Sequence, residues 1–149
     1  KFITYLVKRL KEKKLMSTLQ NCKILSIPKI EDPRGNLSVI ENDVIPFDIK
    51  RVYYLYDVPS GAERGGHSHK EQQEFLVALS GSFDVILNDG KVEKTVTLNK
   101  PFEGLLITSG IWRELKNFSS GAVCLVIASD VFLEEDYIRE FEDFLKSKS

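Results

Sequence analysis

The sequence contains few of the cysteines and histidines that commonly form disulfides or bind metals. Its 149 residues include two cysteines, two histidines, one methionine and one tryptophan. Cys22 and Cys124 are too few to build a disulfide framework, and they fit a reducing cytoplasm. No apolar run is long enough to span a membrane, and a net charge of −1 gives no electrostatic excess for nucleic-acid binding. The sequence therefore argues against a disulfide-stapled secreted domain, a membrane protein and a nucleic-acid binder, and the expected location is the cytoplasm.

The remaining composition is that of one globular domain. Hydrophobic residues make up 42% and charged residues 29% of the chain. A chain of this length buries about two-thirds of the surface that it exposes when unfolded, so its core needs neither a disulfide nor a metal.

The charge is concentrated at the start of the chain. Residues 1–15 carry a net charge of +5, and the rest carries −6. Apolar residues recur there at helical spacing, at Phe2, Leu6 and Leu10. One interpretation is a basic amphipathic helix for a membrane surface or a partner. The interpretation that we favour is an appended or upstream segment, with Met16 as the natural start and residues 16–149 as a single domain.

The middle of the chain has the pattern of a β-protein. Short apolar or alternating runs separated by turn residues predict strands at 23–27, 37–40, 50–58, 74–79, 83–87, 92–98, 104–108 and 122–128. Many short strands at regular spacing indicate a β-sandwich or a small barrel. After Asp130 the period changes to 3.6, which predicts an amphipathic helix packed on the outside of the barrel through Tyr137, Ile138, Phe141, Phe144 and Leu145.

Both histidines fall in one tripeptide, His67-Ser68-His69. Residues two apart on a strand point to the same face, so a strand here would project both imidazoles together. The local alternative is a pair of surface histidines in a loop, because Gly65-Gly66 precedes them.

The wider spacing resolves this choice. Gly61, His67, His69, Glu74 and Gly81 reproduce the first motif of the cupins, which this segment resembles. The resemblance implies a double-stranded β-helix, a jelly-roll-like barrel with all-β architecture. In metal-binding cupins the two histidines and the glutamate are ligands together with a third histidine. The chain has no third histidine.

The position of that third histidine corresponds here to Arg113, whose charge would repel a divalent cation. We therefore expect no cofactor, with His67 and His69 as free acid/base groups, since imidazole titrates near neutral pH. The alternative is an open metal site of His67, His69 and Glu74.

A closer resemblance covers about residues 23–145. The chain is similar to the cupin-type dTDP-sugar 3,4-ketoisomerases, which resemble the C-terminal part of WxcM-like proteins. The matching segments are Asp32–Leu37, Ile49–Tyr56, Arg64–Lys70, Leu79–Ser82, Ile111-Trp112, Ala128–Asp130 and Asp136–Arg139. The chain departs from the family at Arg113, where histidine is common, and at Glu74, where glutamine is common.

The resemblance implies a reaction on dTDP-4-keto-6-deoxy-D-glucose. The carbonyl moves from C4 to C3 through an enediolate, and the product serves deoxy amino sugar synthesis for surface polysaccharide. Such a step needs a base, a proton shuttle and stabilisation of the enediolate, but no redox cofactor. The expected catalytic residues are His69 as the base, His67 as its partner and Tyr53 as a proton donor. The expected substrate-binding residues are Arg34, Arg51, Arg64 and Trp112.

Two other functions and an assembly state stay open at this point. The first is an RmlC-like epimerase acting on a similar 4-keto sugar, and the second is a metal-dependent cupin, either a dioxygenase or a small-ligand sensor. The resemblance also implies a homodimer with an exchanged N-terminal strand, which would bring Arg34 to the site of the partner. Neither nucleic acid nor a membrane is an expected partner.

Overall fold

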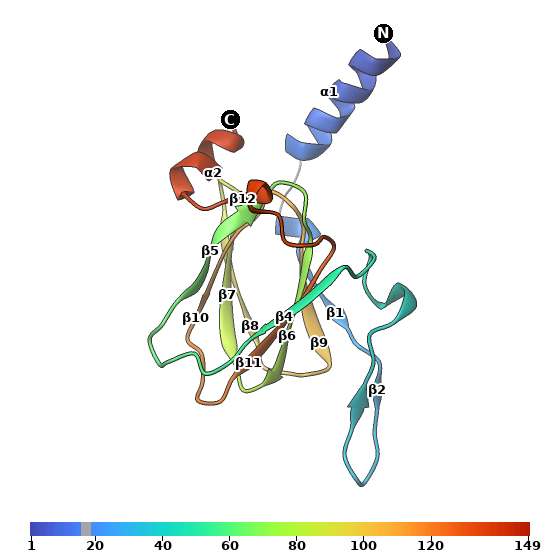
Figure 1. The fold of residues 1–149 in the computed structure, drawn as a ribbon, viewed down its shortest axis with the longest axis vertical. Helices are drawn as coiled ribbons and strands as arrows, with labels where there is room; N and C mark the ends of the chain where they lie inside the picture. Colours follow the sequence, from blue (N-terminus) through green and yellow to red (C-terminus); the bar gives the residue numbers. More distant parts are fainter. Residues whose placement is uncertain (16–18) are drawn as a thin grey trace.

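The computed structural model describes residues 1–15 and 19–149, and for residues 10–15 and 42 it describes the backbone alone. Met16, the predicted start of the domain, lies outside the described residues. Helix α1 (Phe2–Leu15) extends beyond the β-structure in Figure 1. No helix among the described residues is long and apolar enough to cross a membrane.

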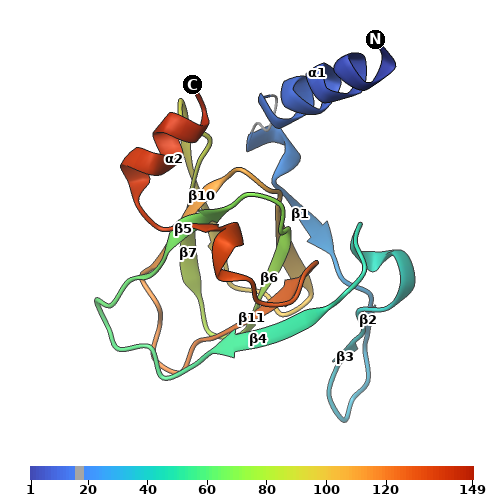
Figure 2. The same ribbon diagram turned by 45° about the horizontal axis from the view of Figure 1, so that its top comes forward.

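Two five-stranded antiparallel sheets face each other and form a barrel (Figures 1 and 2). The first sheet has the order β1 (Lys23–Ser26), β9 (Glu103–Ile107), β6 (Glu74–Ser80), β11 (Val123–Ala128) and β4 (Arg51–Leu55). The second has the order β12 (Tyr137–Ile138), β5 (Arg64–His69), β10 (Trp112–Lys116), β7 (Phe83–Asn88) and β8 (Glu93–Leu98). The predicted all-β, jelly-roll-like architecture is confirmed.

The core lies between the sheets and follows the strand period of two. On β7 the buried residues Phe83, Val85 and Leu87 alternate with half-buried ones. Strand β6 is buried on both faces, because Leu76 joins the interior cluster while Phe75 joins a second cluster on the outer face. The segment leading into β4 covers that outer face, so only one side of β6 can contribute to an interior site.

A small hairpin projects from the barrel. It consists of β2 (Lys29–Ile30) and β3 (Leu37–Ser38), and Figure 1 shows it extending away from both sheets. Its apolar residues Ile30 and Leu37 are more than half exposed. Three short 3₁₀ helices, η1 (Leu19–Asn21), η2 (Asn42–Val44) and η3 (Glu134–Asp136), complete the described elements.

The structure corrects the prediction for the end of the chain. Tyr137 and Ile138 form strand β12, which pairs with β5, and helix α2 (Phe141–Ser147) begins only at Phe141. The prediction of one helix through all five apolar residues is therefore wrong. The pairing of β12 with β5 uses backbone groups that a helix would need for its own hydrogen bonds.

Strand β10 was not predicted from the sequence. Its inward side carries Arg113 as well as Leu115, and both are buried. A charged residue at an interior position hides the apolar alternation by which strands are recognised.

Candidate active site

The two histidines lie side by side on the interior face of β5. Their ring centroids are 4.8 Å apart with the planes nearly perpendicular. Strand β10 pairs with β5 on one side, with Arg113 opposite His67, and β12 pairs on the other, with Tyr137 opposite His69. Gly65 permits the close approach to β10, because a Cβ there would lie 3.0 Å from the carbonyl oxygen of Arg113 and its φ is +81°.

His67 faces two cavities that share part of their walls. The larger has a volume of about 560 Å³, and its lining includes Arg51, Arg64, His67, Tyr137 and Arg139. The inner cavity, of about 80 Å³, reaches among apolar core residues and is lined by His67, Glu74 and Arg113 among others. A site of this size and polarity suits a small-molecule ligand with negative charge.

Glu74 is the centre of a buried polar cluster. It accepts a very short hydrogen bond from Arg113 at Oε1, and at Oε2 it accepts one from Tyr53 (2.6 Å) and one from Gln72 (3.2 Å). Burial by itself raises the pKa of Glu74. His69, the charge of Arg113 and the Tyr53 hydroxyl outweigh burial and hold the pKa well below its ordinary value. The group is therefore a carboxylate at neutral pH.

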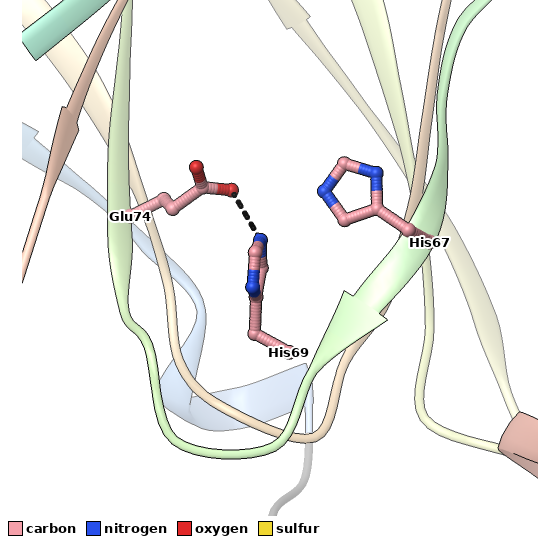
Figure 3. A group of neighbouring side chains, drawn as sticks. All are labelled: His67, His69 and Glu74. Atoms are coloured by element: carbon pink, nitrogen blue, oxygen red, sulfur yellow. Dashed lines mark ion pairs between the residues drawn. The ribbon is translucent and has the colours of Figure 1, made fainter. Parts of the chain in front are cut away.

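His69 is fully buried between two carboxylates. Its Nδ1 lies 3.0 Å from Oδ2 of Asp136, and its Nε2 lies 3.4 Å from Oε1 of Glu74. Figure 3 shows Glu74 and His67 projecting from opposite sides toward the space beside this ring. Nε2 of His67 is buried and has no hydrogen-bond partner among the described residues. The arrangement thus leaves one nitrogen of His67 open beside the cavities, while Nε2 of His69 faces the Glu74 carboxylate.

His67 has a strongly perturbed titration. Burial, reinforced by the positive charge of Arg113, lowers the pKa of His67 to about 3. Because this value lies below the ordinary one of about 6.5, the neutral ring stabilises the fold fully above pH 6.5. That contribution is lost as the pH falls from 6.5 toward 3.

We expect this perturbation to be visible by NMR. The chain has only two histidines, so their ring signals can be assigned with one His67→Asn variant. The Cε1 signal of His67 should stay unmoved from pH 8 to pH 5, since the ring remains neutral throughout. A titration of this signal with a midpoint near 6.5 would contradict the burial and the Arg113 contact that we describe.

The described residues also contain one group that could hold a metal ion. Ligand atoms of His67, His69 and Glu74 all lie within 4.8 Å of one another. The Glu74 carboxylate, however, is already neutralised by Arg113 and accepts two further hydrogen bonds. A divalent cation would have to displace the guanidinium and then lie beside its charge. These residues do not fit a metal, and we derive no step through one.

The structure brings some of the predicted site residues together and not others. Arg51 and Tyr53 face the interior from β4, and Arg64 lines both cavities. Trp112 points to the other side of β10 and packs against Phe141 and Phe144 of α2, so the prediction that it contacts substrate is wrong. The physical reason is strand alternation: Arg113 points inward, so its neighbour must point outward.

Arg34 also lies outside the cavities. It is at the exposed turn of the β2–β3 hairpin, where its guanidinium pairs with Asp32. Within one chain the structure does not bring Arg34 to the histidines.

Four residues of the site were not predicted from the sequence, and one of them is Arg139, which lines the larger cavity. Tyr137 lies against both imidazole rings, with centroids 5.0 and 4.3 Å away, and its hydroxyl accepts a hydrogen bond from Arg51. Asp136 pairs with His69, and Gln72 donates to Glu74. The only available signal was that Asp136, Tyr137 and Arg139 belong to the matched segment near the end of the chain.

Comparison with known proteins agrees with this geometry. Residues 20–149 match the family model FdtA, described as WxcM-like, C-terminal. The TDP-4-oxo-6-deoxy-alpha-D-glucose-3,4-oxoisomerase of Aneurinibacillus thermoaerophilus is 46% identical over 125 residues, which cover 83% of this chain and 90% of that protein.

Two solved structures are similar over nearly their whole length. The TDP-quinovose 3,4-ketoisomerase WlaRB of Campylobacter jejuni is 48% identical with a TM-score of 0.81, covering 85% of this chain and 98% of that one. The sugar 3,4-ketoisomerase QdtA of Thermoanaerobacterium thermosaccharolyticum, in complex with TDP, is 40% identical with a TM-score of 0.85, covering 88% of this chain and 96% of that one.

Proposed function

The chain belongs to the FdtA family, the WxcM-like C-terminal group, and from this membership we propose that it is a TDP-sugar 3,4-ketoisomerase. The proposed substrate is dTDP-4-keto-6-deoxy-D-glucose, whose carbonyl moves from C4 to C3. The observation that carries the proposal is the pair of adjacent imidazoles, of which His67 lines a cavity that Arg51, Arg64 and Arg139 also line. The named activities of the relatives support the same reaction.

The two cavities suggest how such a substrate would lie. Arg51, Arg64 and Arg139 line the larger one, and guanidinium groups pair well with the oxygens of a diphosphate. We propose that the nucleotide diphosphate binds there and that the hexose reaches inward toward His67. A cavity of about 560 Å³ lies within the usual range for ligands of this size.

The proposed chemistry is a balanced pair of proton transfers. His69 takes the proton from C3, the C3–C4 bond gains double-bond character in an enediolate, and the proton returns at C4. His67 moves the remaining proton from the C3 oxygen to the C4 oxygen. The substrate oxidises itself at C3 and reduces itself at C4, so no electron leaves the hexose.

Two further groups suit roles in this step. Burial and the Glu74 charge raise the pKa of Tyr53 far above its ordinary value, so its hydroxyl keeps its proton and remains a hydrogen-bond donor. Arg113 lines the inner cavity and supplies the positive charge that a developing enediolate needs.

The proposal includes a dimer. The projecting β2–β3 hairpin, with its exposed Ile30, Leu37 and Arg34, is suited to cross to a second copy and bring Arg34 to the site there. The exposed outer face of β4, with Val52 and Tyr54 more than half exposed, is suited to the same contact. We place the enzyme in the cytoplasm, supplying a keto sugar for amino sugar synthesis.

Product analysis tests the proposed function. Protein treated with a chelator and then freed of it is incubated with dTDP-4-keto-6-deoxy-D-glucose, and ¹³C NMR locates the carbonyl. We expect it at C3, with the product accepted by an aminotransferase specific for that position. A carbonyl that stays at C4 with inverted neighbouring carbons would show an epimerase instead. Activity that appears only after metal is added would show a metal-dependent cupin.

A further inference from the structure

One arginine of the proposed diphosphate site is already paired with a carboxylate. Of Arg51, Arg64 and Arg139, which line the larger cavity, only Arg139 forms an ion pair within the described part of the chain. Its Nε donates to Oε1 of Glu134 at 2.7 Å, and its Nη2 donates to Oε2 at 2.9 Å. Two parallel hydrogen bonds of this kind are also the geometry in which a guanidinium binds a phosphate group. Glu134 therefore occupies donors that a diphosphate would use.

Arg139 lies on the boundary between two depressions of the surface. Together with Tyr137 it lines the larger cavity, and the same two residues line a neighbouring depression of about 490 Å³. Glu134 lines the neighbouring depression but not the larger cavity. The ion pair thus directs the Arg139 guanidinium toward a carboxylate that lies outside the proposed substrate site.

The guanidinium of Arg139 rests on an aromatic ring that is itself held in place. Its central carbon lies 4.3 Å from the centroid of the Tyr137 ring. The backbone of Tyr137 pairs with β5, and its hydroxyl accepts a hydrogen bond from Arg51. The attraction between a guanidinium and an aromatic face depends on the cation lying over the ring. Arg139 can therefore swing from Glu134 toward the larger cavity while it keeps this contact.

The pair of Glu134 and Arg139 is exposed enough to be exchanged. The side chain of Arg139 is 51% exposed and that of Glu134 is 60% exposed. Ion pairs in such surroundings contribute little net stability, because water screens both charges. A diphosphate offers more charge and more acceptor oxygens than one carboxylate, so it can displace Glu134 from the guanidinium. The same N–H groups cannot donate fully to both acceptors, so binding of the diphosphate to them must break the pair.

We propose that Glu134 and the diphosphate of the substrate compete for Arg139. In the free enzyme Glu134 holds the guanidinium, and in the complex Arg139 exchanges this carboxylate for phosphate oxygens. Glu134 thereby lowers the affinity of the site for the nucleotide. This inference rests on the proposed function, because it takes the larger cavity as the diphosphate site.

The test is Glu134→Gln, with the affinity for TDP measured by isothermal titration calorimetry. Glutamine keeps the shape of the side chain, but a neutral amide holds the guanidinium less strongly than a carboxylate does. We expect the Kd for TDP to fall about two- to fivefold, which is the range that an exposed ion pair contributes. An unchanged Kd would show that Glu134 does not compete. A higher Kd would show that Glu134 positions Arg139 for the ligand, and it would overturn the proposal as well.

The matched control is Glu135→Gln. Glu135 is the next residue of η3, is exposed, and lines neither the larger cavity nor the neighbouring depression. Its replacement removes the same negative charge near the site without releasing Arg139. We expect the Kd for TDP to stay near the wild-type value. A fall as large as that of Glu134→Gln would attribute the effect to net charge alone and overturn the proposal.

A double variant tests whether Glu134 acts through Arg139. Arg139→Gln should raise the Kd for TDP roughly tenfold or more, because it removes charge-assisted hydrogen bonds to phosphate. When Glu134→Gln is added to Arg139→Gln, the Kd should fall no further than Glu135→Gln would lower it, since no guanidinium remains to be released. An equal gain in both backgrounds, or a Kd that Arg139→Gln leaves unchanged, would contradict the competition.

A direct readout of the exchange is the Nε–H signal of Arg139 in ¹⁵N-labelled protein, assigned by its loss in Arg139→Gln. This signal should shift when TDP is added to the wild-type enzyme, and a signal that stays in place at saturation would overturn the proposal. Wild-type protein that bound TDP in this way but left the carbonyl of the keto sugar at C4 would refute the proposed reaction and leave the competition intact. Isomerisation by the wild type, with equal Kd values for the wild type and Glu134→Gln, would refute the competition alone.

Discussion

Replacing His69 with asparagine should lower kcat on the TDP-4-keto sugar by about a thousandfold, and His67→Asn by about a hundredfold. The imidazoles are 4.8 Å apart inside the barrel, and Nε2 of His67 is buried without a hydrogen-bond partner among the described residues. Asparagine keeps the side-chain polarity but cannot accept and return a proton at neutral pH. The measurement is the initial rate of 3-keto product formation, followed by NMR or by coupling to an aminotransferase.

A control variant lies on the same strand between the two histidines. Ser68 is fully buried on the other face of β5, and its Oγ has no hydrogen-bond partner among the described residues. Ser68→Ala therefore changes β5 without removing a proton carrier, and it should retain the wild-type rate. Histidine variants with undiminished turnover would show that the proton carriers lie elsewhere in the barrel.

A larger loss for His69 than for His67 would follow from their surroundings. His69 is flanked by the carboxylates of Asp136 and Glu74, which stabilise an imidazolium after proton uptake. His67 lies beside Arg113, and its pKa is lowered to about 3, so it is better suited to pass a proton on than to hold one. An equal loss for both variants would instead indicate one relay in which neither ring acts alone.

The part of the site that the sequence could predict is the part encoded by short spacing. His67 and His69 are two residues apart, so strand geometry alone puts them on one face. The same rule joins Arg51 with Tyr53, and the structure places both toward the interior. A fixed spacing to Glu74 then identified the barrel, because a motif that spans two consecutive strands and their connection is a local sequence pattern.

The part that could not be predicted depends on long-range pairing. The contact between His69 and Asp136 joins residues 67 apart in the chain. The contact exists because β12 pairs with β5. A strand of two residues is too short to produce a periodic pattern from which it could be predicted. Trp112 illustrates the same limit. A shift of one residue in the register of β10 would turn its ring from helix α2 to the interior of the barrel, and the sequence does not fix that register.

The buried pair of Glu74 and Arg113 leads to the largest expected effect on stability. Glu74→Ala removes the partner of a guanidinium that is 1% exposed, and it also removes the acceptor of Tyr53 and Gln72. Leaving a buried charge uncompensated costs about 3–5 kcal/mol of the free energy of unfolding. Urea denaturation at pH 7 measures this loss, and Glu74→Gln, which keeps an acceptor oxygen, should lose less.

The double variant Glu74→Leu/Arg113→Met distinguishes a charge effect from lost packing. When both charges are replaced by apolar side chains of similar size, no buried charge is left alone, and most of the stability should return. The activity should not return with the stability. In the double variant the Tyr53 hydroxyl has lost the carboxylate that accepts its hydrogen bond, and the inner cavity has lost the guanidinium of Arg113. If the loss of stability in the double variant equalled the sum of the losses in the two single variants, Glu74 and Arg113 would not be the charge-balanced pair that their geometry indicates. If stability and turnover recovered together, the cation beside His67 would have no part in the chemistry, and its burial would serve the fold alone.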